Sequence, residues 1–389
     1  MSTAARIPPR TTGGRTPVFP EYARVRHTIA LLLLIFITVF LPSLSSGAPP
    51  SSVVVGRGVS PEATAENSQR KLLVDPQGRL LLAYVRPAGD VDQVFLAESA
   101  DGGRTWRSTQ MTQAPRPARL PSLALFPDNS VHLVWTEYAP IGVVLYRERR
   151  GGRWTAPVGL SQLGVYAGVP VVAPRGGQPH VLWYGILPER PTVRTRHGSI
   201  YEIVFTRRAA AAWSPPVSIS PGIPDSINPA LDTGAGSRLH AAWYQFDSRV
   251  YQIRYAQFDG RWSPPRNVTS GPAEHTRVAL AADGADVHLV WEEQGARRQI
   301  MYLRLAERPQ PLATGPVHDP VVAAAGGRVV AAWSEDQAII LLQVRPSGES
   351  LRLGAGSGPM VALRGNVAYV AWTSADPVPV LRFTAVPLR

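Results

Sequence analysis

The feature that most constrains this chain is a short apolar segment that recurs along it and carries an aromatic residue near its end. Six copies have tryptophan at this place, at positions 135, 183, 243, 291, 333 and 372, and a seventh, LLLAYVR at 80–86, has Tyr84. A second, downstream place holds the four remaining tryptophans, at 106, 154, 213 and 262. Such repeats indicate similar supersecondary units that bury their apolar faces against one another.

The spacing of the tryptophans defines the size of the unit. Trp243 is followed by Trp262 after 19 residues and by Trp291 after 48, and Trp135 has the same two spacings to its counterparts. Within a unit, β-branched and aromatic residues form four short runs that turn residues separate, and no stretch after residue 60 sustains a helical period. Units of about 40–50 residues with four strands each predict an all-β fold, a β-propeller of four-stranded blades.

The number of blades follows from the number of repeats. We predict seven blades, with six as the alternative if one repeat is vestigial. The last repeat, 359–389, offers only three strands, whereas the segment 52–56 (SVVVG) upstream of the first repeat is rich in valine. We therefore expect an N-terminal strand to close the ring in the last blade, which would hide two sheet edges.

The first 48 residues have the composition of an export signal. Five arginines precede an apolar run at 29–41, and the small residues of SLSSGA follow it. The run is short for a bilayer span, which needs about 20 residues. We expect residues 1–48 to be a cytoplasmic basic segment with a signal peptide or signal anchor. Residues 49–389 would form one extracytoplasmic domain, secreted or tethered to the membrane only through 29–41.

Composition excludes several classes of function. The chain has no cysteine, so it forms no disulfide, thiolate metal site or cysteine nucleophile. Its net charge is +12, but it has no run of five basic residues and Lys71 is its only lysine, so we expect no nucleic-acid partner. Four histidines, at 132, 180, 240 and 288, occupy equivalent places in different repeats. A ring would hold them apart, so we expect them to pack rather than to bind a metal, and we expect no metal or other cofactor.

One octapeptide gives the chain a family resemblance. Residues 99–106, SADGGRTW, fit the Asp-box pattern Ser-x-Asp-x-Gly-x-Thr-Trp through Ser99, Asp101, Gly103, Thr105 and Trp106. The chain therefore resembles sialidases and their relatives with BNR repeats, and three later copies keep the tryptophan while losing the acid, the glycine or both. We expect a structural turn, because Asp101 can accept its own backbone N–H groups and Trp106 can bury a large ring. The resemblance implies that this turn lies on the rim opposite the ligand pocket.

Candidate ligand-binding residues lie where a propeller presents its loops, at the ends of the second strands and between the blades. Acids follow several tryptophan segments, and the candidate catalytic residues are Glu137, Tyr138, Glu292 and Glu335. Neighbouring positions supply candidate ligand-binding residues: His275, Arg277, Glu293, His318 and Asp319. Acids, histidine and arginine on one rim can bind a sugar or a cation or perform acid–base chemistry, whereas a purely structural interpretation makes them solvated turn residues.

The resemblance also implies the parts of a working sialidase. These are three arginines for the substrate carboxylate, a Tyr–Glu nucleophile pair and an Asp acid/base. The family's Arg-Ile-Pro signature occurs here only at 6–8, upstream of the apolar run, so the catalytic set is incomplete. We therefore expect an exported monomer that binds a glycan or another surface ligand on its loop-rich face.

Two alternatives remain open for the function. The first is a retaining exo-sialidase or related glycoside hydrolase that uses the candidate catalytic residues together with arginines such as Arg277. The second is a protein-interaction scaffold that docks through a basic insertion at 188–196.

Overall fold

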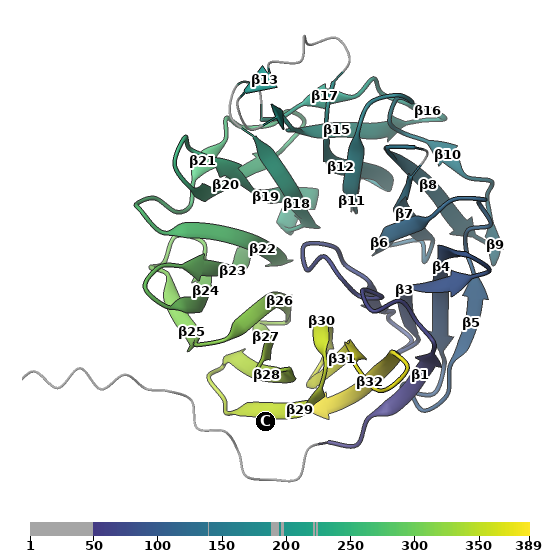
Figure 1. Cartoon of the computed structure of the whole chain (residues 1–389), viewed down its shortest axis with the longest axis vertical. Helices are drawn as coiled ribbons and strands as arrows, with labels where there is room; N and C mark the ends of the chain where they lie inside the picture. Colours follow the sequence, from purple (N-terminus) through teal and green to yellow (C-terminus); the bar gives the residue numbers. More distant parts are fainter. Residues whose placement is uncertain (1–49, 139, 188–193, 196–197, 221, 223–224) are drawn as a thin grey trace, which may run out of the picture. The chain divides into compact units, whose positions relative to one another are not determined.

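A computed structural model describes residues 50–389 apart from 139, 188–193, 196–197, 221 and 223–224. Seven antiparallel sheets of four or five strands surround a central axis (Figure 1), which confirms the predicted propeller with seven blades rather than six. The expected export signal at 1–48 and most of the proposed docking insertion lie outside the described residues. Within the described residues, no helix is long and apolar enough to cross a membrane.

The strands of the first four blades have the following bounds. Blade 1 contains β2 (Leu72–Val74), β3 (Leu80–Ala88), β4 (Val91–Ser99) and β5 (Arg107–Gln110). Blade 2 contains β6 (Ala118–Leu125), β7 (Val131–Tyr138), β8 (Gly142–Arg150), β9 (Arg153–Trp154) and β10 (Val158–Gly159). Blade 3 contains β11 (Ala167–Arg175), β12 (Gln178–Gly185), β15 (Glu202–Ala209), β16 (Ala212–Trp213) and β17 (Val217–Ser218), with an inserted hairpin of β13 (Arg194–Thr195) and β14 (Gly198–Ser199). Blade 4 contains β18 (Ser226–Thr233), η1 (Ala235–Ser237), β19 (Leu239–Phe246), β20 (Tyr251–Phe258) and β21 (Arg266–Asn267).

The remaining three blades follow the same order. Blade 5 contains β22 (Glu274–Asp283), β23 (Asp286–Gln294), β24 (Arg298–Arg304) and β25 (Gln310–Thr314). Blade 6 contains β26 (Val317–Ala325), β27 (Arg328–Glu335), β28 (Ala338–Arg345) and β29 (Ser350–Ala355). Blade 7 contains β30 (Ser357–Arg364), β31 (Val367–Ser374) and β32 (Val380–Pro387), and β1 (Val53–Arg57) pairs with β32.

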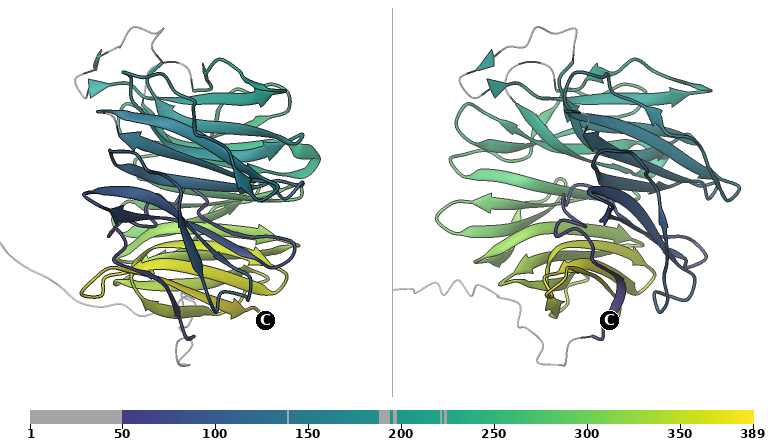
Figure 2. Two further views of the ribbon diagram at one scale, coloured as in Figure 1. Left: turned by 90° about the vertical axis from the view of Figure 1, so that its right-hand side faces the viewer. Right: turned by 45° about the vertical axis from the view of Figure 1, so that its right-hand side comes forward.

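The register of the strands defines two faces. Glu137 at the end of β7 pairs with Ala118 at the start of β6 and with Val143 near the start of β8, and the other blades follow this pattern. We call this side the mouth face. The opposite face carries the turns between first and second strands and between third and fourth strands, and Figure 2 shows the ring edge-on with hairpins at both faces.

The repeated aromatic residues hold adjacent blades together. Six tryptophans of the second strands are at most 2% exposed, and Tyr84 is fully buried. Trp291 of blade 5, for example, packs in one cluster with Ala230 and Tyr244 of blade 4. Burial of large aromatic side chains supplies much of the hydrophobic stabilisation, since each buries about 150–250 Å².

Six of the seven inner strands contain a β-bulge near the mouth face. The extra residue of each bulge has a positive φ, at Leu120, Val169, Asn228, Arg277, Asp319 and Gly358. Backbone of this kind costs about 1–3 kcal/mol at a non-glycine residue unless the surroundings hold it in place. Other contacts near the axis of the ring must therefore stabilise these bulges.

Blade 1 supplies these contacts. Ala63 O accepts a hydrogen bond from Val85 N, and Lys71 O accepts one from Ala83 N, so residues 64–70 occupy the bulge position of this blade. We call residues 64–70 the plug, since they form the excursion that lies at the centre of the ring (Figure 1). Lys71 at its end is 1% exposed, and burial lowers the pKa of its ammonium group to about 7.

The plug makes hydrogen bonds to each of the other six blades. Asn67 Nδ2 donates to Arg277 O at 2.6 Å and to Pro320 O at 2.7 Å. Gln69 Nε2 donates to Leu120 O at 2.7 Å and to Pro170 O at 2.8 Å. Three further side-chain contacts reach blades 4 and 7: Asn228 with Glu66, Arg70 with Asp232, and Thr64 with Thr373.

Removing either plug amide will destabilise the protein. In Asn67→Ala or Gln69→Ala, two backbone carbonyls at the bulges lose their donors, which costs about 2–4 kcal/mol in free energy of unfolding. Ser68→Ala is the matched control, because the buried Ser68 hydroxyl between them has no hydrogen-bond partner among the described residues. Urea unfolding measures the difference, and equal stability of the three variants would contradict a stabilising role for the plug.

The SADGGRTW turn lies on the face opposite the mouth, since Ser99 pairs with Leu80 at the start of β3. Asp101 Oδ1 accepts the backbone N–H groups of Arg104 and Thr105 at 2.9 and 3.0 Å, and Thr105 Oγ1 donates to Asp101 Oδ2 at 2.7 Å. These hydrogen bonds lower the pKa of Asp101 and fix the turn.

The same turn joins blade 1 to blade 7. The Trp106 ring meets Phe383 of β32 edge-on at a centroid distance of 5.0 Å. Gly103 has a φ of +90°, and a Cβ atom there would lie 2.0 Å from Phe383 Cε1. A glycine is therefore required both for its backbone conformation and for the close approach of Phe383.

Gly103→Ala will destabilise the protein more than the equivalent change in blade 2. Gly152 occupies the corresponding turn with a φ of +79° and has no atom within 4 Å of the Cβ position. Gly152→Ala carries only the backbone cost of about 1 kcal/mol, whereas Gly103→Ala adds about 1–3 kcal/mol of overpacking against Phe383. Thermal unfolding of both variants checks the difference, which should shrink when Phe383→Leu accompanies Gly103→Ala.

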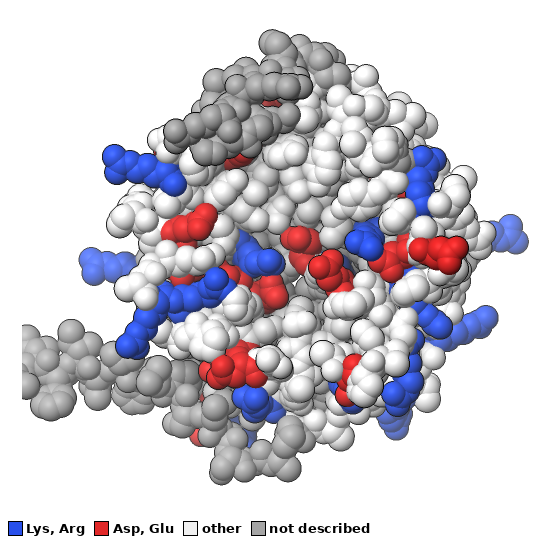
Figure 3. All heavy atoms as spheres, in the orientation of Figure 1, with Lys and Arg blue, Asp and Glu red and all other residues white. Residues whose placement is uncertain are grey.

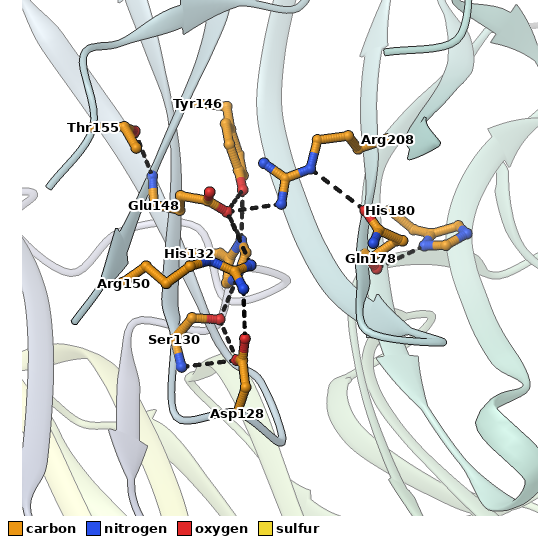
Figure 4. Close-up of polar contacts among 10 residues, drawn as sticks. All are labelled: Asp128, Ser130, His132, Tyr146, Glu148, Arg150, Thr155, Gln178, His180 and Arg208. Carbon is orange, nitrogen blue, oxygen red and sulfur yellow. Dashed lines mark hydrogen bonds and ion pairs between the residues drawn. The ribbon is translucent and has the colours of Figure 1, made fainter. Parts of the chain in front are cut away.

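The repeated histidines make hydrogen bonds within their own blades. His132 Nδ1 lies 2.6 Å from the Tyr146 hydroxyl, its Nε2 lies 2.8 Å from Ser130 Oγ, and Tyr146 donates to Glu148 at 2.8 Å (Figure 4). His240 and His288 contact tyrosine hydroxyls of blades 4 and 5 in the same way, at 2.6 and 2.8 Å.

Burial of the histidines makes stability depend on pH. Burial lowers the pKa of His132 to about 3 and the pKa values of His180 and His275 to about 4, from an ordinary value of 6.5. Between pH 6.5 and about 4 the unfolded chain therefore binds protons that the folded chain does not, so the free energy of unfolding falls as the pH falls. Each such histidine adds about 1.4 kcal/mol per pH unit to the slope. Urea unfolding from pH 7 to 4.5 should show a shallower slope in His132→Gln, and an unchanged slope would refute the assignment.

Candidate functional site

The plug places an acidic residue, Glu66, near the mouth of the central channel. Its carboxylate Oε2 accepts a hydrogen bond from Asn228 Nδ2 at 2.9 Å, and its backbone carbonyl accepts one from Lys71 Nζ at 3.0 Å. Burial raises the pKa of Glu66, against the opposing effect of Arg277 and Lys71. Sequence reasoning missed Glu66 because it belongs to no repeat.

Four tyrosines from three consecutive blades lie within electrostatic range of Glu66. They are Tyr138 of blade 2, Tyr166 and Tyr184 of blade 3, and Tyr244 of blade 4, and we call them the tyrosine arc. The Tyr166 and Tyr184 hydroxyls are 2.8 Å apart. Burial raises the pKa of Tyr138 to about 12 and raises those of the other three, so all four hydroxyls stay protonated at neutral pH. Tyr138, Tyr166 and Tyr184 are half-buried and can offer both an apolar ring face and a hydroxyl to a ligand, whereas Tyr244 is buried.

A charged cluster from blades 5 and 6 completes the surroundings of the mouth. It consists of Arg277, Glu292, Arg298, His318 and Asp319. Arg277 pairs with Asp319 at 2.7 Å and approaches Glu292 at 3.6 Å, while Arg298 and His318 approach Glu292 at 3.8 and 3.9 Å. Figure 3 shows acidic and basic side chains gathered around the centre of the face that it displays.

Glu292 is the most enclosed member of the charged cluster, with a side chain that is 2% exposed. Its Oε1 accepts the backbone N–H of Asp319 at 2.8 Å. Burial raises the pKa of Glu292, whereas the Asp319 N–H and the arginine charges oppose that rise. A buried carboxyl group with a raised pKa beside accessible arginine is an arrangement suited to proton transfer as well as to hydrogen bonding.

The structure thus brings together four candidate residues named from the sequence: Arg277, Glu292, His318 and Asp319. Tyr138 belongs to the tyrosine arc, and the remaining candidates have other partners. Glu137 pairs with Arg116 at 2.9 Å, and Glu335 accepts the Trp333 indole N–H at 2.8 Å. His275 is 4% exposed and accepts the Trp291 indole N–H at 3.0 Å, with Glu293 3.5 Å away.

Three arginines near the mouth pair with separate acids. These pairs are Arg116 with Glu137 at 2.9 Å, Arg119 with Asp92 at 2.6 Å and Arg277 with Asp319 at 2.7 Å. A carboxylate clamp requires arginines that point to one place with free N–H groups. Arg116, Arg119 and Arg277 instead direct N–H groups to three different acids, while Arg277 and Arg298 both approach Glu292, at 3.6 and 3.8 Å.

The chemistry of this face follows from its side chains. Among the described residues, no group of three or more histidine, aspartate or glutamate side chains could hold a metal ion. The face offers carboxylates and tyrosine hydroxyls for hydrogen bonds, aromatic surface for apolar contact, and two carboxyl groups, Glu66 and Glu292, with raised pKa values. These are the means by which proteins bind sugars and transfer protons to or from them.

Comparison with known proteins finds solved structures that have a similar fold. No protein-family model and no curated protein matches the sequence. The structure is similar to a PL25 ulvan lyase bound to -[GlcA(1-4)Rha3S]-, with a TM-score of 0.57 and 10% identity over 87% of this chain and 96% of that one. It is also similar to the α-L-arabinanase of Penicillium chrysogenum complexed with arabinobiose, with a TM-score of 0.50 and 12% identity over 88% of this chain and 99% of that one.

A third similar structure has a different activity. A puromycin-hydrolyzing peptidase of Mycobacterium tuberculosis has a TM-score of 0.56 and 17% identity, over 87% of this chain and 56% of that one. At such identities the likeness shows the fold alone, and one fold carries many activities.

Proposed function

We propose that the protein binds carbohydrate on its mouth face, between the tyrosine arc and the charged cluster. The observation that carries the proposal is the arrangement around Glu66, with the half-buried tyrosines of blades 2 and 3 on one side and carboxylates paired with arginine on the other. Tyrosine rings contact the C–H faces of sugars, and carboxylates accept hydrogen bonds from their hydroxyl groups. Two of the similar structures, the ulvan lyase and the arabinanase, hold saccharides, which supports this class of ligand.

The proposal extends to chemistry and location. Glu292 is our choice for a proton-transferring residue, because it is enclosed, has a raised pKa and lies 3.6 Å from the exposed Arg277. On the composition of residues 1–48, we propose that the domain acts outside the cytoplasm. The exo-sialidase alternative needs three arginines directed at one substrate carboxylate, whereas here Arg277 and Arg298 approach the protein's own Glu292 and two further mouth arginines pair with other acids.

Arg277→Met will weaken glycan binding at least tenfold. The change keeps an unbranched, flexible side chain but removes the charge beside Asp319 and Glu292. Arg153→Met is the matched control, because Arg153 is exposed in β9 on the opposite face. Affinity electrophoresis of the full chain in gels containing arabinan, ulvan or sialylated mucin measures retention.

The same gels and a product assay separate the alternatives. Retention by at least one polysaccharide, lost in Arg277→Met and kept in Arg153→Met, is the expected result. Failure of all three polysaccharides to retard the wild-type chain would overturn the proposal. Release of sialic acid from the mucin, abolished in Glu292→Gln, would instead establish the exo-sialidase alternative.

A further inference from the structure

We propose that a pocket between blades 6 and 7 is a subsite for an uncharged, hydroxyl-rich sugar unit, an inference that rests on the proposed carbohydrate function. The pocket has a volume of about 440 Å³, and the described residues that line it include Pro316, His318, Asp319, Ser334 and Asp376. It opens where β26 begins and where β27 and β31 end, which is the mouth face. We call it the interblade pocket.

The interblade pocket is continuous with the charged cluster. His318 and Asp319 line the pocket and belong to the cluster as well. The Asp319 backbone N–H donates to Glu292, and the Asp319 carboxylate binds Arg277 at 2.7 Å. A saccharide with one unit beside Arg277 and Glu292 would therefore extend its next unit directly into the pocket.

The charges of the lining favour an uncharged unit, because its two carboxylates already bind arginines that do not line the pocket, Arg277 and Arg382, at 2.7 and 2.8 Å. Hydrogen bonds from the Ser374 hydroxyl and the Arg382 guanidinium lower the pKa of Asp376, and Asp319 is a second acidic residue that lines the same pocket. Burial and the neighbouring Arg298 lower the pKa of His318, so its imidazole is neutral at pH 7. No lysine or arginine is among the described residues lining the pocket. Carboxylates accept hydrogen bonds from sugar hydroxyls but repel a uronate or a sulfate.

A buried hydroxyl without a partner also points to a ligand. Ser334 is 6% exposed, lines the pocket, and its Oγ makes no hydrogen bond within the described structure. A buried polar group that lacks a partner is costly, so an added hydroxyl group that reaches it would be favoured. Pro316, Ala355 and Ala375 add apolar surface for the C–H groups of a sugar ring.

The test fills the pocket from an exposed position. Ala375 is exposed on the loop after β31, so Ala375→Trp should fold and block the pocket. Ala211→Trp is the matched control, because Ala211 is exposed in the turn between β15 and β16 on the opposite face. The probes are arabinotriose, which is neutral, and an ulvan-derived oligosaccharide, which carries uronate and sulfate, and isothermal titration calorimetry of the full chain measures affinity.

The inference predicts that arabinotriose binds the wild type and Ala211→Trp equally and binds Ala375→Trp at least tenfold more weakly. Ser334→Ala should weaken arabinotriose binding several-fold without lowering the melting temperature, which a merely structural hydroxyl would not do. Arabinotriose binding that Ala375→Trp leaves unchanged would overturn the subsite and leave the proposed function standing. Binding of the ulvan oligosaccharide but not of arabinotriose would also overturn the subsite and leave the proposed function standing. If neither probe binds and no polysaccharide gel retards the protein, both proposals are overturned.

Discussion

The structure depends on a small set of hydrogen bonds at its centre. Two side-chain amides, those of Asn67 and Gln69, bind four backbone carbonyls that belong to blades 2, 3, 5 and 6. Those carbonyls lie at bulges whose positive-φ residues are unfavourable in an isolated strand. The plug therefore links blades that are not neighbours, in addition to the hydrophobic contacts that link each blade to the next.

The same bulges place the side chains of the candidate site. Asn228, Arg277 and Asp319 are bulge residues of three consecutive blades, and they contact Glu66 or one another beside the channel. A regular strand would send alternate side chains to the two faces of its blade, whereas a bulge redirects one residue. The backbone strain of the inner strands and the composition of the site thus have one structural origin.

The sequence predicts the number and the strand content of the blades, but it does not predict the plug at the centre of the ring. The tryptophan repeats indicate seven four-stranded units, and a ring puts the blade 5 residues Arg277 and Glu292 beside the blade 6 residues His318 and Asp319. Glu66 and the plug were not predictable in this way, because they interrupt the first repeat and their partners are distant in the chain. A usable signal was present, since proline follows the bulge residue at 121, 170, 229, 320 and 359. Proline disfavours helical backbone at the residue before it. The recurrence of proline, however, does not by itself reveal which segment fills the centre of the ring.

The plug has a consequence for how such a chain can change its size. Repeat proteins commonly lengthen or shorten by duplication or loss of whole units, because each unit contacts only its neighbours. Here one short segment of blade 1 makes hydrogen bonds to all six other blades. Duplicating or deleting a blade would displace several of these partners at once. The plug thus fits a ring of seven blades, and a variant of this chain with six or eight would leave several of its hydrogen bonds unmade.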